Sequence, residues 1–148
     1  MSGPVADGVE QRLGGPKPYL LLPGTAAEAL AFYAEIFGGS VTLHRFDEFG
    51  RSDGPPAAIA HGELRGPVSL YAADAGEGEA SFSATGLLWS LLGVASPGET
   101  QRRFAALAEG GTILDPLQVR PWAASDGQVT DRFGVTWLLG YEAAANEH

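Results

Sequence analysis

The feature that most constrains this chain is an internal repeat at an offset of about half its length. Each copy reads, in order, as an apolar strand, a helix start, an amphipathic helix and a Gly-Gly stop. The pairs offset by 71 are Thr25 and Ser96, Glu28 and Glu99, Tyr33 and Phe104, and Ile36 and Leu107; the stops Gly38-Gly39 and Gly110-Gly111 are offset by 72. A period of this size predicts two copies of one supersecondary unit.

Each predicted helix has recognisable ends. Thr25-x-x-Glu28 and Ser96-x-x-Glu99 match the capping box, in which two side chains satisfy amide groups at a helix start. Pro97 suits the first helical position of the second helix. The Gly-Gly pairs supply a residue that adopts positive φ beyond the last turn. Ala26, Leu30, Tyr33 and Phe37 recur at helical spacing, which predicts one buried face.

Strand-like runs fill most of the rest of both halves. They cover 19–22, 41–46, 57–64 and 68–72 in the first half, and 87–94, 112–114, 128–130 and 135–141 in the second. Residues 116–127 are predicted as a long loop. The pattern predicts an α+β fold of two βαβββ modules that form a curved mixed sheet with the helices on its outer face. A concave cleft between related halves is a common place for a small-molecule site.

Length and composition set the limits of the fold and of its partners. The 148 residues suit one domain at 17–142, with modules at about 17–74 and 87–142 and a linker at about 75–86. Residues 1–16 and 143–148 are predicted to be disordered tails. The chain has no cysteine, no apolar run of membrane-spanning length and a net charge of −9. We therefore expect a cytoplasmic protein that binds neither nucleic acid nor membranes.

Five motifs together resemble one known superfamily. They are Pro18-Tyr19-Leu20, Glu28-Ala29-x-x-Phe32-Tyr33-x-x-x-Phe37-Gly38-Gly39, His61-x-x-Leu64, Leu107-Ala108-x-Gly110-Gly111 and Asp131-Arg132-Phe133-Gly134-Val135-x-Trp137. From residue 17 to 141 the chain resembles the vicinal oxygen chelate superfamily of glyoxalases, bleomycin-resistance proteins and extradiol dioxygenases, in particular its PhnB-like branch. The resemblance implies paired βαβββ modules and a homodimer.

The resemblance also implies four strand positions that hold a metal ion in the metal-dependent members. Carried over by motif, these positions are Pro18 or Tyr19, Ser69, Trp89 and Leu138. None of these side chains is a good ligand for a divalent cation, which favours imidazole or carboxylate donors. We therefore expect no standard metal site and no cofactor. Trp89 is expected to face the cleft and to make it aromatic.

A second set of donors keeps a metal site as an alternative. His61 and Glu63 alternate on one strand, and His44 lies on the neighbouring strand, so that three donors can converge. The competing interpretation is a hydrogen-bonded inward His61, a rim carboxylate at Glu63 and a solvent-facing His44. In either case His61 is the residue most expected to touch a ligand.

Two further pairs of residues have both a structural and a functional interpretation. Arg120 and Trp122 lie in the predicted loop 116–127 and can hold a planar or anionic ligand, although Trp122 fits a core position equally well. Asp131 and Arg132 are expected to cap a turn and to form a local ion pair.

The sequence thus predicts a metal-free binder that sequesters an apolar or planar aromatic compound, with His61, Trp89, Arg120 and Trp122 in its site. The alternatives are a glyoxalase-like lyase or isomerase that uses His61, with or without a metal, and an interaction domain without a ligand.

Overall fold

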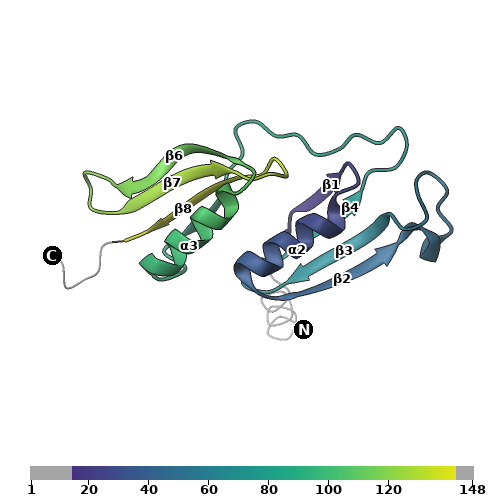
Figure 1. Cartoon of the computed structure of the whole chain (residues 1–148), viewed down its shortest axis with the longest axis horizontal. Helices are drawn as coiled ribbons and strands as arrows, with labels where there is room; N and C mark the ends of the chain where they lie inside the picture. The colour runs from purple at the N-terminus through teal and green to yellow at the C-terminus, as the bar shows by residue number, and fades with distance from the viewer. Residues whose placement is uncertain (1–14, 143–148) are drawn as a thin grey trace, which may run out of the picture.

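The computed structural model describes residues 15–142 and contains the predicted repeat (Figure 1). Module 1 consists of β1 (Tyr19–Leu22), α2 (Ala26–Phe37), β2 (Ser40–Arg45), the 3-10 helix η1 (Phe46–Phe49), β3 (Ile59–Arg65) and β4 (Leu70–Asp74). Module 2 consists of β5 (Trp89–Leu92), α3 (Pro97–Ala108), β6 (Thr112–Val119), β7 (Ser125–Thr130) and β8 (Thr136–Tyr141). The α+β class and the two βαβββ modules are confirmed. Apart from Gly15 and Pro16, the two predicted tails lie outside the described residues.

The two modules have the same sheet topology. The strand orders are β1-β4-β3-β2 and β5-β8-β7-β6. In each sheet the first strand of the module pairs in parallel with the last, and the other pairings are antiparallel. Within residues 15–142 the eight strands therefore divide into two four-stranded sheets instead of one shared curved sheet. Residues 75–88 connect the two sheets.

The two helices begin in different ways, although their sequences look alike. Ser96 is an N-cap as predicted, because its Oγ accepts a hydrogen bond from the Glu99 amide at 3.1 Å. The reciprocal half of the capping box is not formed, because the Glu99 carboxylate binds Arg102 and Arg103 instead. The capping box predicted at Thr25 is wrong, since the Thr25 side chain makes no cap bond. Asp74, at the end of β4, replaces it: its carboxylate accepts hydrogen bonds from the amides of Ala26 at 2.9 Å and Ile59 at 2.8 Å. A residue 48 positions away in the sequence thus caps α2.

The glycine stops also serve close packing in both modules. Gly39 has a φ of +114°, and a Cβ atom there would collide with the Arg65 carbonyl oxygen. In module 2 a Cβ atom on Gly111 would collide with the Thr130 carbonyl oxygen. Each module thus needs a glycine where the chain leaves its helix and passes the end of its third strand.

The predicted loop 116–127 is much shorter in the structure. Strand β6 continues to Val119 and β7 begins at Ser125, so that the loop between them is 120–124. Pro116 suggested a loop, but β6 is the edge strand of its sheet. An edge strand tolerates a missing amide donor, and the pairing is irregular on both sides of Asp115.

A buried carboxylate joins the two modules. Asp131 is only 3% exposed and accepts a hydrogen bond from the Tyr33 hydroxyl of α2 at 2.5 Å and another from Trp137 Nε1 at 2.9 Å. Its other oxygen accepts from the amides of Phe133 at 2.8 Å and Val135 at 3.2 Å. The predicted turn capping is confirmed. The predicted ion pair with Arg132 is not formed.

Helix packing continues this contact between the modules. The rings of Tyr33 and Phe37 lie 5.8 and 5.2 Å from that of Trp137, measured between centroids. The predicted helix stripes are buried, and α2 contacts α3 directly (Figure 1). Each helix covers one face of its own sheet and leaves the other face open. In residues 15–142, neither helix has the length and apolar character that a membrane-spanning helix needs.

Candidate ligand-binding faces

Strand alternation determines which side chains lie on the open face of the first sheet. In β1, Leu20 and Leu22 are buried with α2, whereas Tyr19 is 46% exposed. Side chains of successive strand residues point to opposite faces, and residues paired in register share a face. Tyr19 pairs with Tyr71, Tyr71 with Glu63, and His61 with His44. We call Tyr19, His44, His61, Glu63 and Tyr71 the module 1 open face.

Aromatic and imidazole rings cluster at the centre of the module 1 open face. The Tyr19 hydroxyl is 2.8 Å from His61 Nδ1. The ring centroids of Tyr19, His61 and Tyr71 lie 5.2 to 5.6 Å from one another. The His44 ring is stacked on that of His61 at 6.5 Å with an angle of 18° between the planes. These rings offer a flat π surface and hydrogen-bonding groups to a bound molecule.

Charged groups border this aromatic surface. The Lys17 ammonium lies 5.5 Å from the centroid of the Tyr71 ring, and Glu63 forms an ion pair with Arg65 at 3.4 Å. Burial raises the pKa of the Tyr19 phenol, the Arg51 charge lowers it and the Glu79 charge raises it. The Tyr19 hydroxyl therefore keeps its proton at neutral pH and can donate or accept a hydrogen bond.

The alternative metal site is not assembled in this arrangement. His44 and His61 share a face, but His44 Nδ1 lies 3.2 Å from Glu48 Oε1, and Glu63 pairs with Arg65. Across residues 15–142, no three His, Cys, Asp or Glu side chains converge as a metal site would require. The set of His44, His61 and Glu63 therefore does not act as three converging ligands.

Register also tests the four positions that the family resemblance assigned to a metal. The two parallel strand pairs match Tyr19 with Tyr71 in module 1 and Ser90 with Leu138 in module 2. The four positions equivalent to the metal positions are thus Tyr19, Tyr71, Ser90 and Leu138. Tyr71 takes the place expected for Ser69, and Ser90 takes the place expected for Trp89. Two phenols, one hydroxyl and one isobutyl group do not fit the imidazole and carboxylate ligands of a divalent-cation centre.

The expectation that Trp89 faces a cleft is wrong. Trp89 pairs in register with Trp137, which is 1% exposed, so the two side chains share the helix-covered face. Their rings meet edge to face with centroids 5.2 Å apart. Trp89 therefore packs against the core because the open face of β5 begins one residue later, at Ser90.

By the same alternation, Ser90, Leu92, Asp126, Leu138 and Gly140 form the module 2 open face. This face ends at a cavity of about 270 Å³. Its lining includes Leu92, Trp122, Asp126 and Gly140. Trp122 is 67% exposed in the 120–124 loop, so the core position that its sequence also allowed is excluded. Leu92 is 54% exposed. This end of the second sheet is therefore an apolar surface beside a carboxylate.

Arg120 lies at the same end, but carboxylates already bind its guanidinium group. Its Nη2 donates to Asp115 at 2.6 Å and its Nε to Asp126 at 2.7 Å. Hydrogen bonds to these two carboxylates raise the pKa of Arg120. Arg120 thus fixes the base of the loop that carries Trp122, and a ligand anion would have to compete with both aspartates.

The structure separates the predicted site residues into two groups. His61 contacts Tyr19, Tyr71 and His44, all on module 1. Arg120 and Trp122 lie on module 2, and no ring contact or hydrogen bond among the described residues joins them to His61. Sequence reasoning missed Tyr71 as a member of the site. Its alternation with the buried Leu70 and Ala72 was the available signal, but the run looked uniformly apolar.

The family model of the glyoxalase/bleomycin resistance protein/dioxygenase superfamily matches residues 16–139. The chain belongs to this superfamily.

Among its relatives, protein YjdN of Escherichia coli K12 is 31% identical over 137 residues, which cover 82% of this chain and 91% of YjdN. The crystal structure of PA1353 from Pseudomonas aeruginosa is 36% identical and covers 87% of this chain and 98% of that one, with a TM-score of 0.72. A PhnB protein of Bacillus cereus, described as a putative 3-demethylubiquinone-9 3-methyltransferase, is 24% identical. It covers 86% of this chain and 99% of its own with a TM-score of 0.74, and at that identity it supports the fold alone.

Proposed function

We propose that this protein binds and sequesters a planar, largely apolar small molecule without a metal ion. The observation that carries the proposal is the ring cluster of Tyr19, His61 and Tyr71 on the module 1 open face. Such a surface favours stacking of a flat ligand, and the Tyr19–His61 pair supplies a polar group that can orient it. An open sheet face alone, however, would cover only one side of the ligand.

A homodimer would supply the second side. Each chain carries one aromatic open face on module 1 and one apolar, tryptophan-bearing face on module 2. A two-fold axis that places module 1 of one copy against module 2 of the other creates two identical clefts, and two-fold dimers are the commonest soluble oligomers. Each cleft would then combine His61 from one copy with Trp122 from its partner. The high exposure of Tyr19, Leu92 and Trp122 supports this arrangement.

Fluorescence titration with planar aromatic dyes tests the binding site. We expect the dyes to quench tryptophan fluorescence, and Tyr71→Ala and Trp122→Ala each to weaken binding by about 1–3 kcal/mol, the usual range for loss of a stacking partner. Trp89→Phe is the matched control, because it changes a core-facing tryptophan and should leave affinity unchanged. Unchanged affinity in both Tyr71→Ala and Trp122→Ala would refute the proposed site.

Light scattering coupled to size exclusion tests the dimer. At roughly 10–50 µM, where a complex with micromolar Kd is mostly formed, we expect twice the chain mass. Leu92→Asp should reduce this to the mass of one chain while the circular dichroism spectrum stays unchanged. A monomeric wild type at these concentrations contradicts the two-chain cleft.

The Tyr19–His61 hydrogen bond also favours a second candidate function, proton transfer in a lyase or isomerase. A tyrosine that holds one nitrogen of an imidazole ring orients the other for a substrate. Turnover of a hemithioacetal by the purified protein, lost in His61→Gln, would support the enzyme. Dye binding without such turnover favours the sequestering function.

A further inference from the structure

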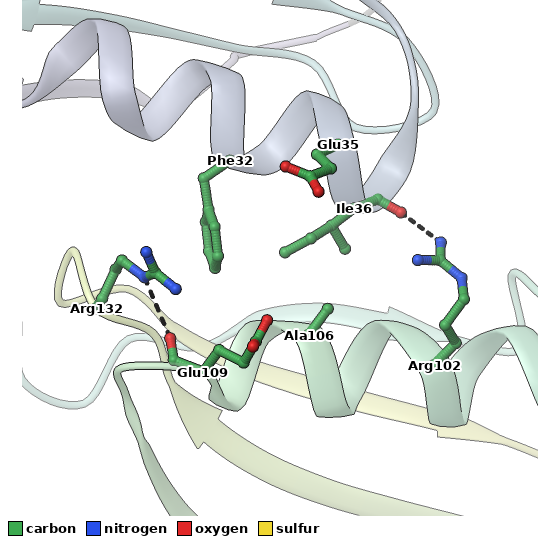
Figure 2. Close-up of a pocket in the computed structure, with 7 residues that line it drawn as sticks. All are labelled: Phe32, Glu35, Ile36, Arg102, Ala106, Glu109 and Arg132. Carbon is green, nitrogen blue, oxygen red and sulfur yellow. Dashed lines mark hydrogen bonds between the residues drawn. The ribbon is translucent and has the colours of Figure 1, made fainter.

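A separate cavity of about 180 Å³ lies where α2 meets α3 (Figure 2). Phe32, Glu35 and Ile36 line it from α2 in module 1, and Ala106, Glu109 and Arg132 line it from module 2. These residues lie on or next to the two helices, or in the case of Arg132 in the turn before β8, and not on the open faces, so this cavity is independent of the proposed function. Pockets for drug-sized ligands measure roughly 300–1,000 Å³, and this cavity therefore suits a smaller compound.

One side of the cavity presents a positioned guanidinium group. Arg132 Nε donates to the Glu109 carbonyl oxygen at 3.2 Å, and the guanidinium carbon lies 4.6 Å from the centroid of the Phe32 ring. These two contacts hold the guanidinium group at the end of the cavity beside Phe32, where one terminal nitrogen points toward the space between the helices (Figure 2). Among residues 15–142, Arg132 takes part in no side-chain ion pair, so its charge is available to an anionic group.

Two carboxylates face the same space from opposite helices. Glu35 extends from α2 and Glu109 from the end of α3, and Figure 2 shows both side chains turned toward the cavity. Neither forms an ion pair within the described part of the chain. A cationic group between them would be attracted by both carboxylates, while Ile36 and Ala106 offer apolar surface beneath it.

Arg102 closes the far end of the cavity, and its guanidinium group is already bound by other groups of the protein. Its Nε and Nη2 bind the Glu99 carboxylate at 2.9 and 2.6 Å. Nη2 also donates to the Ile36 carbonyl oxygen at 2.6 Å, at the end of α2. The groups open to a ligand are thus one guanidinium and two carboxylates, separated by a small apolar floor.

We infer that the cavity between α2 and α3 binds a small zwitterion of the α-amino acid type. The ligand carboxylate lies on Arg132, its ammonium group between Glu35 and Glu109, and its short apolar side chain over Ile36 and Ala106. A simple anion would be repelled by the two glutamates, and a simple amine would leave the Arg132 charge without a partner. Only a compound that carries both charges matches all three groups.

Amide NMR titration with L-valine as the probe tests this site. We expect saturable shifts of the α2 and α3 amides around the cavity, with a Kd of about a millimolar, as befits so small a ligand. Isovalerate lacks the ammonium group of valine and isobutylamine lacks its carboxylate. Each analogue should bind at least about tenfold more weakly than L-valine, because one set of charge-assisted hydrogen bonds is lost.

Two charge-removing variants locate the contacts. Glu35→Gln and Arg132→Met should each weaken L-valine binding by about tenfold. Glu28→Gln removes the same charge from the exposed first turn of α2 and should leave affinity unchanged. Glu35→Gln remains decisive if Arg132→Met unfolds.

The inference is overturned if L-valine causes no saturable shift at about ten times the expected Kd. It is equally overturned if isovalerate binds as tightly as L-valine, or if Glu35→Gln leaves affinity unchanged. Dye binding at the open faces is measured separately by fluorescence, so failure of either idea is recognised without the other.

Discussion

Removal of one hydroxyl group should measure how strongly the two modules are held together. Tyr33→Phe deletes the donor from α2 to the Asp131 carboxylate and keeps the ring contacts with Trp137. Hydrogen bonds to charged groups contribute about 1.5–3 kcal/mol, and both partners here are buried. Asp131 retains its bonds to Trp137 Nε1 and two amides, so the loss should stay within this range.

Urea denaturation and thermal unfolding give the measurement. We expect Tyr33→Phe to lower the free energy of unfolding by about 1.5–3 kcal/mol and Tm by about 3–12 °C for a chain of this size. Tyr141→Phe is the control, because it removes an exposed hydroxyl that accepts one bond from Gln101 and should cost about 0.5 kcal/mol or less. If Tyr33→Phe costs no more than Tyr141→Phe, the buried carboxylate does not join the modules as argued.

The same hydroxyl predicts a dependence of stability on alkaline pH. Burial first, and then the charge and hydrogen bond of Asp131, raise the pKa of Tyr33 above its ordinary value of 10.0. The folded state therefore keeps a proton that the unfolded chain loses. The contribution of the Tyr33 hydroxyl to the free energy of unfolding is fully present below pH 10. Above pH 10 this contribution falls by about 1.4 kcal/mol per pH unit. In this range the free energy of unfolding of Tyr33→Phe should fall less steeply with pH than that of the wild type. Equal slopes in the two proteins would contradict the assignment.

Local structure leads to two further predictions. Thr25→Ala should change the free energy of unfolding by less than about 0.5 kcal/mol, whereas Ser96→Ala should lower it by about 1 kcal/mol. Asp74→Ala should lower it by about 2 kcal/mol or more. Equal effects of Thr25→Ala and Ser96→Ala in urea titrations would contradict the cap assignments. Gly39→Ala and Gly111→Ala should each lower the free energy of unfolding by about 1–3 kcal/mol, because a Cβ atom would collide with a backbone carbonyl at both sites. A wild-type Tm in both variants would show that the backbone shifts to relieve these collisions.

The candidate site shows how far pattern reasoning extends. His61 is expected to touch a ligand because an imidazole donates, accepts or carries a proton near neutral pH, and the structure places it on an open, aromatic face. Trp89 was assigned to the wrong face because a shift of one residue reverses every side chain of a strand. The register that corrects it comes from β8, which lies more than forty residues further along the chain.

The two modules can be predicted from local patterns in the sequence. Helical spacing, glycine stops and the offset of 71 residues predict two βαβββ units, because periodicity and chain reversal depend on neighbouring residues. Two features follow from the folded structure alone: Asp74 instead of Thr25 caps α2, and Asp131 joins Tyr33 to Trp137. The contacts of Asp74 with Ala26 and of Asp131 with Tyr33 connect residues 48 and 98 positions apart, and no local pattern records which distant donor a buried carboxylate will meet.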